Sequence, residues 1–195
     1  LGENRLLIQR GLQVLNRTQR PGLQQLLLSA GYVDRPVDSI GVAFHLAPRL
    51  NVAGRLRSPE LAFRLLRSRD ETEAAALADE LGQLNSRRQT LQRAAMAEAE
   101  ALVSPQDLAG ESMIFLLGES WHLGVIGLLA SKLLERFGRP VVVCTGQRRD
   151  GTYTGSARSI TRPSPPPVTS RKVNPTEGSA IASRRITSDI ACASA

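Results

Sequence analysis

One long run of helix-forming residues, 71–103, constrains the fold of this chain more than any other feature of its sequence. Leucine and alanine recur there at alternating steps of three and four residues, which is the spacing of one face of an α-helix. At ~1.5 Å per residue, such a helix would be ~50 Å long. Arg88 and Glu98 interrupt the apolar stripe and Gly82 weakens its first half. We therefore favour a rigid helix that connects two domains over the alternative, a coiled-coil dimer.

The residues before this long helix predict three shorter helices. One of them begins with Pro21, because proline is common in the first turn of a helix. Another follows Ser58, a suitable N-cap residue, with Pro59 just inside the helix. The three helices are predicted over residues 4–16, 21–30 and 59–68, and the polar segment PRLNVAGRL, residues 48–56, is interpreted as an irregular connection.

The periodicity changes after the long helix. Short apolar runs at 112–118 and 140–145 are typical of buried strands, and residues 124–137 between them have helical spacing. Residues 152–160 fit a further strand. Strand, helix and strand in this order predict a small α/β unit with a right-handed crossover. The last stretch, residues 161–195, is rich in Ser, Pro and Thr without apolar periodicity, so we predict that it is disordered.

Composition excludes several classes of protein. Two cysteines and two histidines are too few for a disulfide scaffold or a zinc-finger framework. No apolar run approaches the roughly 18 residues of a membrane span, so we expect a soluble, cytoplasmic protein with no membrane partner. The 25 Lys and Arg residues exceed the 18 Asp and Glu residues, and all but two of the basic residues are arginine. Because arginine binds phosphate with two parallel hydrogen bonds, this balance suits a nucleic-acid or phosphate partner.

Three segments contain candidate anion-binding residues. In residues 48–56, Arg49 and Arg55 flank Asn51 and could reach one anion, or else could pair with carboxylates on the surface of the protein. His122 follows Trp121 directly before a predicted helix, where helix amide groups attract phosphate; the alternative is a packed, hydrogen-bonded histidine. The GSARS segment offers the compact set Gly155, Ser156 and Arg158, although such turns are common without a ligand.

No metal site can be assembled from these residues. The acidic residues are scattered, and neither histidine has a carboxylate or a second histidine at ligand spacing. His45 lies in an apolar stretch, which favours a structural role. Cys144 lies in a predicted buried strand, where a thiol is inert.

Six ordered segments of the chain together resemble one family of enzymes, and the resemblance covers residues 2–160. The segments are GENRLLIQRGLQVLN, RPGLQQLL, HLAPRLNVAGRL, LNSRRQ, SWHLGVIGLLASKLLERFGRPVVV and GSARSI. Their order is similar to that in the RecJ-type single-strand-specific DNA exonucleases of the Asp-His-His phosphoesterase superfamily. The resemblance implies a hydrolase that degrades single-stranded DNA from the 5′ end in recombination and repair, with Mn²⁺ or Mg²⁺ as cofactor.

The resemblance also implies a division of the chain. Residues 1–70 would be the C-terminal end of the metal-binding catalytic domain, 71–103 the connecting helix and 112–160 the start of a small α/β associated domain, followed by the non-homologous tail 161–195. By resemblance, Arg55, Ser156 and Arg158 contact the 5′-phosphate, Arg49 and Asn51 shape the same pocket, and His122 lies near the scissile phosphate as a catalytic residue. The family implies a monomer, whereas the residues themselves leave the oligomeric state open.

Departures from the family pattern limit what the chain can do alone. The Asp-His-His motif and the other metal-binding aspartates would lie before Leu1, and a later Gly-Gly-His segment is replaced by the tail. We therefore expect an internal piece of such an enzyme, inactive by itself because it lacks the metal centre. The alternatives are a non-catalytic module that binds single-stranded nucleic acid, a phosphodiesterase for short oligonucleotides, or a product whose unpaired apolar faces prevent folding.

Overall fold

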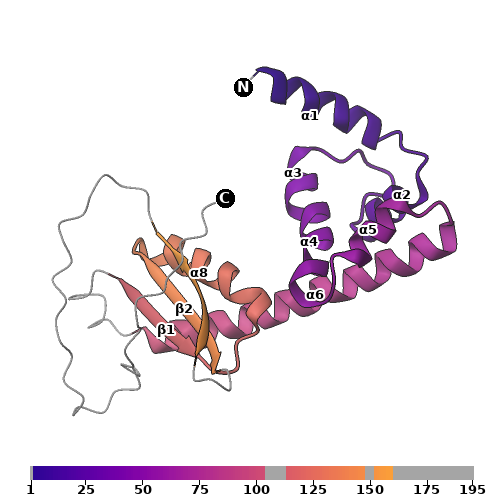
Figure 1. Ribbon diagram of the computed structural model, residues 1–195. Helices are drawn as coiled ribbons and strands as arrows, with labels where there is room; N and C mark the ends of the chain where they lie inside the picture. The colour runs from indigo at the N-terminus through magenta and orange to yellow at the C-terminus, as the bar shows by residue number, and fades with distance from the viewer. Residues whose placement is uncertain (1, 104–112, 148–151, 160–195) are drawn as a thin grey trace, which may run out of the picture. The chain divides into compact units, whose positions relative to one another are not determined.

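The computed structural model describes residues 2–103, 113–147 and 152–159 of the chain (Figure 1). The fold divides into two compact units. The helical unit comprises Leu1–Ala97 with His122–Val125, and the sheet unit comprises Glu98–Trp121 with Ile126–Ala195. The predicted disordered stretch, 161–195, lies outside the described residues. Among the described residues, no helix has both the length and the apolar character needed to cross a membrane.

The helices of the first part of the chain lie close to the predicted positions. The predictions over 4–16, 21–30, 59–68 and 71–103 are confirmed to within three residues at each end. The observed elements are α1 (Gly2–Leu15), α2 (Pro21–Ser29), α3 (Ser39–Gly41), a π-helical turn η1 (Val42–Leu46), α4 (Ala47–Leu56), α5 (Glu60–Arg67) and α6 (Glu71–Leu102).

The interpretation of residues 48–56 as an irregular connection is wrong, because these residues form helix α4. Val52 and Ala53 are completely buried there, so tertiary burial outweighs the local signals of Pro48 and Gly54. Proline within a helix removes the amide that would bond to the carbonyl four residues earlier. The π turn directly before Pro48, in which the amide of Ala47 bonds to the carbonyl of Val42, accommodates this break in the usual spacing.

The core of the helical unit is aliphatic. Its fully buried side chains come from α2, α4, α5 and the first half of α6, and the largest of them are Leu26, Val52, Leu65 and Leu81. Helix α1 differs, because none of its residues is buried and most of its apolar side chains, Leu6, Leu7 and Ile8 among them, are exposed, although Leu15 packs against the core. The core of the helical unit is therefore formed by α2, α4, α5 and α6, and α1 contributes little to it.

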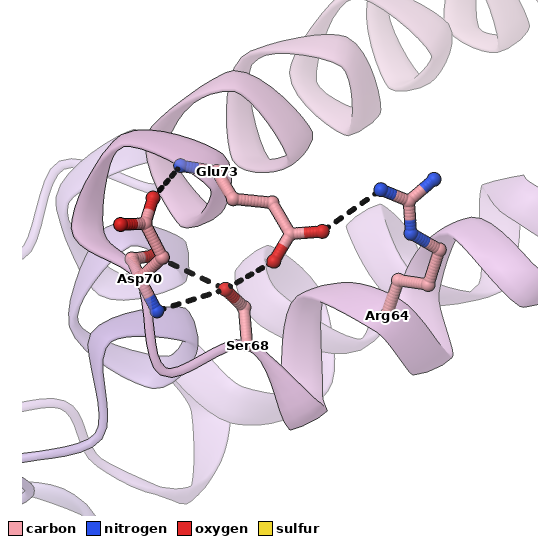
Figure 2. A network of polar contacts seen from close by, with 4 residues as sticks. All are labelled: Arg64, Ser68, Asp70 and Glu73. Carbon is pink, nitrogen blue, oxygen red and sulfur yellow. Dashed lines mark hydrogen bonds and ion pairs between the residues drawn. The ribbon is translucent and has the colours of Figure 1, made fainter.

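A polar network fixes the turn where α5 ends and α6 begins (Figure 2). Asp70 accepts a hydrogen bond at 2.7 Å from the backbone amide of Glu73, so it caps the amino end of α6. The Glu73 carboxylate returns to α5, where it lies 2.8 Å from both Nη2 of Arg64 and Oγ of Ser68. These contacts explain why the long helix begins at Glu71.

The sheet unit has the predicted strand–helix–strand order. Strands β1 (Ile114–Gly118) and β2 (Val141–Gln147) are parallel neighbours, and helix α8 (Leu123–Phe137) connects them. Strand β3 (Tyr153–Arg158) pairs antiparallel with β2 and forms the edge of the three-stranded sheet, whose order is β1-β2-β3. The pairing shifts by one residue near Gly146, which adopts the left-handed backbone conformation with φ 59°. The α/β prediction is confirmed for this part of the chain.

We predict that Glu73 makes the stability of the chain depend on pH. Hydrogen bonds from Arg64 and then Ser68 lower the pKa of the Glu73 carboxyl in the folded state. Because the folded pKa is the lower one, this stabilisation is complete above the ordinary glutamate pKa and disappears as pH falls through the folded value. Glu73→Gln should therefore lower the thermal unfolding midpoint at about pH 7, and its difference from the unmodified chain should shrink at about pH 3.5.

The matched control is Glu71→Gln, which changes an exposed carboxylate in the same helical turn. Its unfolding midpoint should follow that of the unmodified chain at both pH values. A Glu73→Gln difference of the same size at both pH values would contradict the role of this carboxylate.

Candidate functional site

Trp121 fixes the chain directly before α8. Its indole ring is only 5% exposed, and its Nε1–H donates to Oε2 of Glu98 at 2.7 Å. The hydroxyl of Thr145, on β2, donates to the Trp121 carbonyl oxygen. A side chain at Gly118 would overlap the indole ring, so glycine is required where β1 ends. Within the Trp-His pair of the sequence, Trp121 therefore has a structural role.

His122 is exposed, in contrast to the packed histidine that was the alternative interpretation. Its Nδ1 accepts a hydrogen bond at 3.0 Å from the backbone amide of Gly124, as an N-cap side chain does. Because Nδ1 acts as the acceptor, the neutral imidazole carries its proton on Nε2. His122 can therefore donate a hydrogen bond from Nε2 to a ligand oxygen while it caps α8.

Arg55 lies beside this start of α8. Its Nη1 is 3.5 Å from the carbonyl oxygen of Gly124. A side chain at Gly124 would overlap the backbone carbonyl of Arg55, so α4 and the first turn of α8 are in direct backbone contact. Within the described residues Arg55 has no carboxylate partner, whereas the neighbouring Arg57 pairs with Glu80. The alternative of a surface ion pair, stated for Arg49 and Arg55, therefore does not hold for Arg55 within the described residues.

Arg49 and Asn51 occupy different surroundings on α4. Arg49 donates to the carbonyl oxygens of His45 at 2.7 Å and Ser29 at 3.2 Å, and burial lowers the pKa of its guanidinium. Asn51 is exposed, and it shares a helix face with Arg55 because the two are four residues apart. Arg49 is six residues from Arg55, so α4 points the two side chains in different directions.

Ser156 and Arg158 form a second cluster, in the sheet unit. The two residues are two positions apart in β3, so their side chains lie on the same face of the strand. Nη1 of Arg158 donates to Oγ of Ser156 at 3.1 Å and to the Ala157 carbonyl oxygen at 2.7 Å. A Cβ atom at Gly127 of α8 would lie 3.4 Å from both side chains, so glycine lets the helix approach them closely. No carboxylate pairs with Arg158 in the described part of the chain.

Gly155 does not belong to this cluster. It is paired with Cys144 of β2, and a side chain at Gly155 would meet the Cys144 sulfur at 2.8 Å. The glycine of the GSARS segment is therefore explained by packing on the opposite face of β3. Burial raises the pKa of the Cys144 thiol, which agrees with the prediction that this cysteine is inert.

The described residues do not fit a metal site. They contain no group of three or more His, Cys, Asp or Glu side chains close enough to hold an ion. His45 instead lies with its Nδ1 2.7 Å from the Tyr32 hydroxyl, and His122 uses its Nδ1 to cap α8. The carboxylate of Glu98 is engaged by Trp121.

Sequence reasoning missed the role of Glu98, which appeared only as an interruption of an apolar stripe. A signal was present in the sequence, because an acidic residue that interrupts an apolar stripe can accept a hydrogen bond from a neighbouring element. Arg88 interrupts the same stripe, and it lies near enough to Arg55 for the two positive charges to interact.

Comparison with known sequences identifies relatives along most of the chain, although no family model matches it. The single-stranded-DNA-specific exonuclease RecJ of Bacillus subtilis (strain 168) is 41% identical over 158 residues, which cover 81% of this chain and 20% of the relative. RecJ of Escherichia coli (strain K12) is 35% identical over 161 residues, which cover 80% of this chain and 28% of the relative. The chain thus spans between about a fifth and just over a quarter of the length of these curated relatives.

Solved structures resemble the fold as well. The crystal structure of RecJ from Thermus thermophilus in complex with Mg²⁺ is 37% identical, with a TM-score of 0.69 over 80% of this chain and 23% of that chain. A crystal structure of exonuclease RecJ bound to manganese gives the same TM-score and identity over 81% of this chain and 38% of that chain. The resemblance to RecJ-type exonucleases is confirmed in sequence and in fold, and relatives with this fold have been solved with Mg²⁺ or Mn²⁺.

We predict that Gly124→Ala destabilises the chain, because the added methyl group would overlap the Arg55 carbonyl. Overpacking of this kind costs about 1–3 kcal/mol of unfolding free energy. The matched control is Gly82→Ala on α6, where no atom lies within 4 Å of the added methyl group. This control should raise stability by up to about 1 kcal/mol through helix propensity. Urea unfolding of the two variants checks the prediction, and equal stabilisation of both would contradict the backbone contact.

Proposed function

We propose that this chain, whose residues match a segment of the RecJ-type single-stranded-DNA-specific exonucleases, is the part of such an enzyme that binds single-stranded DNA at its 5′ end. The complete enzyme would hydrolyse phosphodiester bonds in the 5′→3′ direction, in recombination and repair. In this proposal the chain contributes contacts to the strand and to the 5′-phosphate, and the metal-dependent cleavage of the bond depends on residues outside it.

The observation that carries this proposal is the pair of arginines without a carboxylate partner. Arg55 and Arg158 are both exposed; Arg158 donates to the Ser156 hydroxyl and the Ala157 carbonyl, and Nη1 of Arg55 lies 3.5 Å from the Gly124 carbonyl oxygen. Neither has an ion pair within the described residues. An oriented guanidinium without a counter-charge is suited to a phosphate, which it binds through two parallel hydrogen bonds.

Neutral donors accompany both arginines. Ser156 can donate its hydroxyl to a phosphate oxygen beside Arg158, and exposed Asn51 shares a face of α4 with Arg55. Arg49 would act indirectly, because its bonds to the His45 and Ser29 carbonyls hold α4 against the end of α2. Gly155 would act only by packing against Cys144.

His122 would serve this function as a hydrogen-bond donor. Its Nδ1 is used as an acceptor for the Gly124 amide, so the free donor is Nε2–H. A donor at this position would stabilise negative charge on a phosphate oxygen, together with the positive end of the α8 dipole. General-base catalysis by His122 would need a free nitrogen lone pair, and the cap occupies the one on Nδ1.

We predict that the purified chain does not hydrolyse single-stranded DNA when Mn²⁺ or Mg²⁺ is added. When bound in a complete enzyme of this type, such ions activate water and stabilise the leaving oxygen, and the described residues contain no group able to hold them. Release of nucleotides from an end-labelled oligonucleotide is the measurement. Turnover that depends on metal and copurifies with the chain would contradict this part of the proposal.

We predict that Arg158→Ala weakens binding of a 5′-phosphorylated oligonucleotide roughly tenfold or more, because a charge-assisted hydrogen bond is lost. Binding of the same oligonucleotide with a 5′-hydroxyl should change far less. Fluorescence anisotropy in EDTA measures both affinities. The matched control is Lys132→Ala, which removes one exposed positive charge from α8 of the same unit. Equal losses on the two oligonucleotides would remove Arg158 from the 5′-phosphate site.

A further inference from the structure

A polar cluster lies in the middle of α6, on the face that is otherwise apolar. It consists of Asn85, Arg88 and Gln92, and its two amide side chains are only 5% and 7% exposed. Leu81 and Ala95, one turn away on each side, are buried aliphatic residues. Arg88 and Asn85 belong to the LNSRRQ segment, to which the proposed function above gives no role. A buried polar cluster within an apolar stripe requires a physical reason.

The two amides hold the guanidinium of Arg88 in one orientation. Nη1 of Arg88 donates to Oε1 of Gln92 at 2.9 Å, and Nη2 donates to Oδ1 of Asn85 at 3.0 Å. Both acceptors are neutral, so they orient the guanidinium without neutralising its charge. Two of its five N–H donors are used in this way, and Nε is buried with no partner among the described residues.

Electrostatics make Arg88 costly in the absence of a ligand. Burial lowers the pKa of its guanidinium, and the positive charge of Arg55 lowers it further. No carboxylate pairs with either arginine in the described part of the chain. Arg88 is therefore a half-buried charge with neutral partners and a like charge nearby, and a bound anion would offset this electrostatic cost.

A purely structural role accounts poorly for this arrangement. Arg57 and Arg64, in the same unit, pair with Glu80 and Glu73 respectively, as arginines that stabilise a fold commonly do. Arg87, the neighbour of Arg88, is exposed and makes no hydrogen bond or ion pair within the described residues. Arg88 alone among these four is oriented by neutral amides and is partly withdrawn from water.

We propose that Arg88 and Arg55 together bind one phosphate group of single-stranded DNA, with Asn85 and Gln92 as positioning residues that hold Arg88 in place. The anion would receive hydrogen bonds from the free N–H groups of both arginines, and its charge would remove their repulsion. This inference rests on the proposed function and adds to it a residue from the long helix. The phosphate is either the 5′-terminal group or an internal one of the strand.

Binding of single-stranded oligonucleotides to the full chain in EDTA tests the inference. Arg88→Gln should weaken binding roughly tenfold or more, whereas the matched control Arg87→Gln, which removes the same charge from the adjacent residue, should change it less than about twofold. Loss on a 5′-phosphorylated oligonucleotide alone identifies the terminal phosphate, and equal loss on the 5′-hydroxyl form identifies an internal phosphate. Equal affinities of Arg88→Gln and Arg87→Gln would overturn the inference.

A double-mutant cycle tests whether the two arginines share one anion. If they do, Arg55→Gln combined with Arg88→Gln should weaken binding less than the product of the two single effects, because the second loss acts on a site already disrupted. Independent, multiplicative losses would contradict a shared phosphate.

A second variant, Arg88→Lys, separates a loss of phosphate binding in Arg88→Gln from damage to the structure around residue 88. Arg88→Lys keeps the charge but presents it as a single point, so we expect an affinity between those of the unmodified chain and Arg88→Gln. Unmodified affinity in Arg88→Lys would overturn the proposed two-arginine contact. Failure of the proposed 5′-end function gives a different result from failure of the Arg88 inference. In the first case the unmodified chain would bind 5′-phosphorylated and 5′-hydroxyl strands equally, and Arg88→Gln would still bind both more weakly than Arg87→Gln does.

Discussion

The absence of a side chain at residue 124 is the constraint on which the candidate site depends. Only glycine lets the first turn of α8 touch the backbone of Arg55, and this contact joins residues that are 69 positions apart in the sequence. The same turn is capped by His122, so one backbone contact places an arginine and an exposed imidazole beside a helix amino terminus. Trp121, the residue before His122, is itself hydrogen-bonded to Glu98 and to Thr145.

The periodic parts of the fold were predictable because their burial and their local propensity agree. The long helix has a clear apolar period, and the four described elements after it were indicated by short apolar runs and by helical spacing between them, so their positions follow from the sequence. Residues 48–56 were misjudged because Pro48 and Gly54 indicate a loop locally. Burial of Val52 and Ala53 decides the conformation instead, and burial is a property of the tertiary fold.

The candidate residues were easier to find than their surroundings. Arginine, serine and histidine were identified by chemical type, yet the sequence could not show that Arg49 is held by backbone carbonyls or that Gly155 serves packing against Cys144. The tautomer of His122 likewise follows only from its bond to the Gly124 amide. Arg88 was interpreted as a defect in an apolar stripe, because spacing alone does not distinguish an interrupted face from a polar cluster.

The arginines of the described residues differ in whether a carboxylate compensates their charge. Arginines that stabilise the fold, such as Arg64 at the start of α6, have carboxylate partners that compensate their charge. Arg88 and Arg158 donate hydrogen bonds to neutral oxygens, and Nη1 of Arg55 lies 3.5 Å from one, so no carboxylate of the described residues compensates their charge. In the proposed function, a phosphate would supply the counter-charge that half-buried Arg88 does not receive from any carboxylate of the described residues. Single-stranded DNA remains our proposal for the source of that phosphate, because it carries one at every nucleotide, whereas a neutral ligand would leave the arginine charge uncompensated.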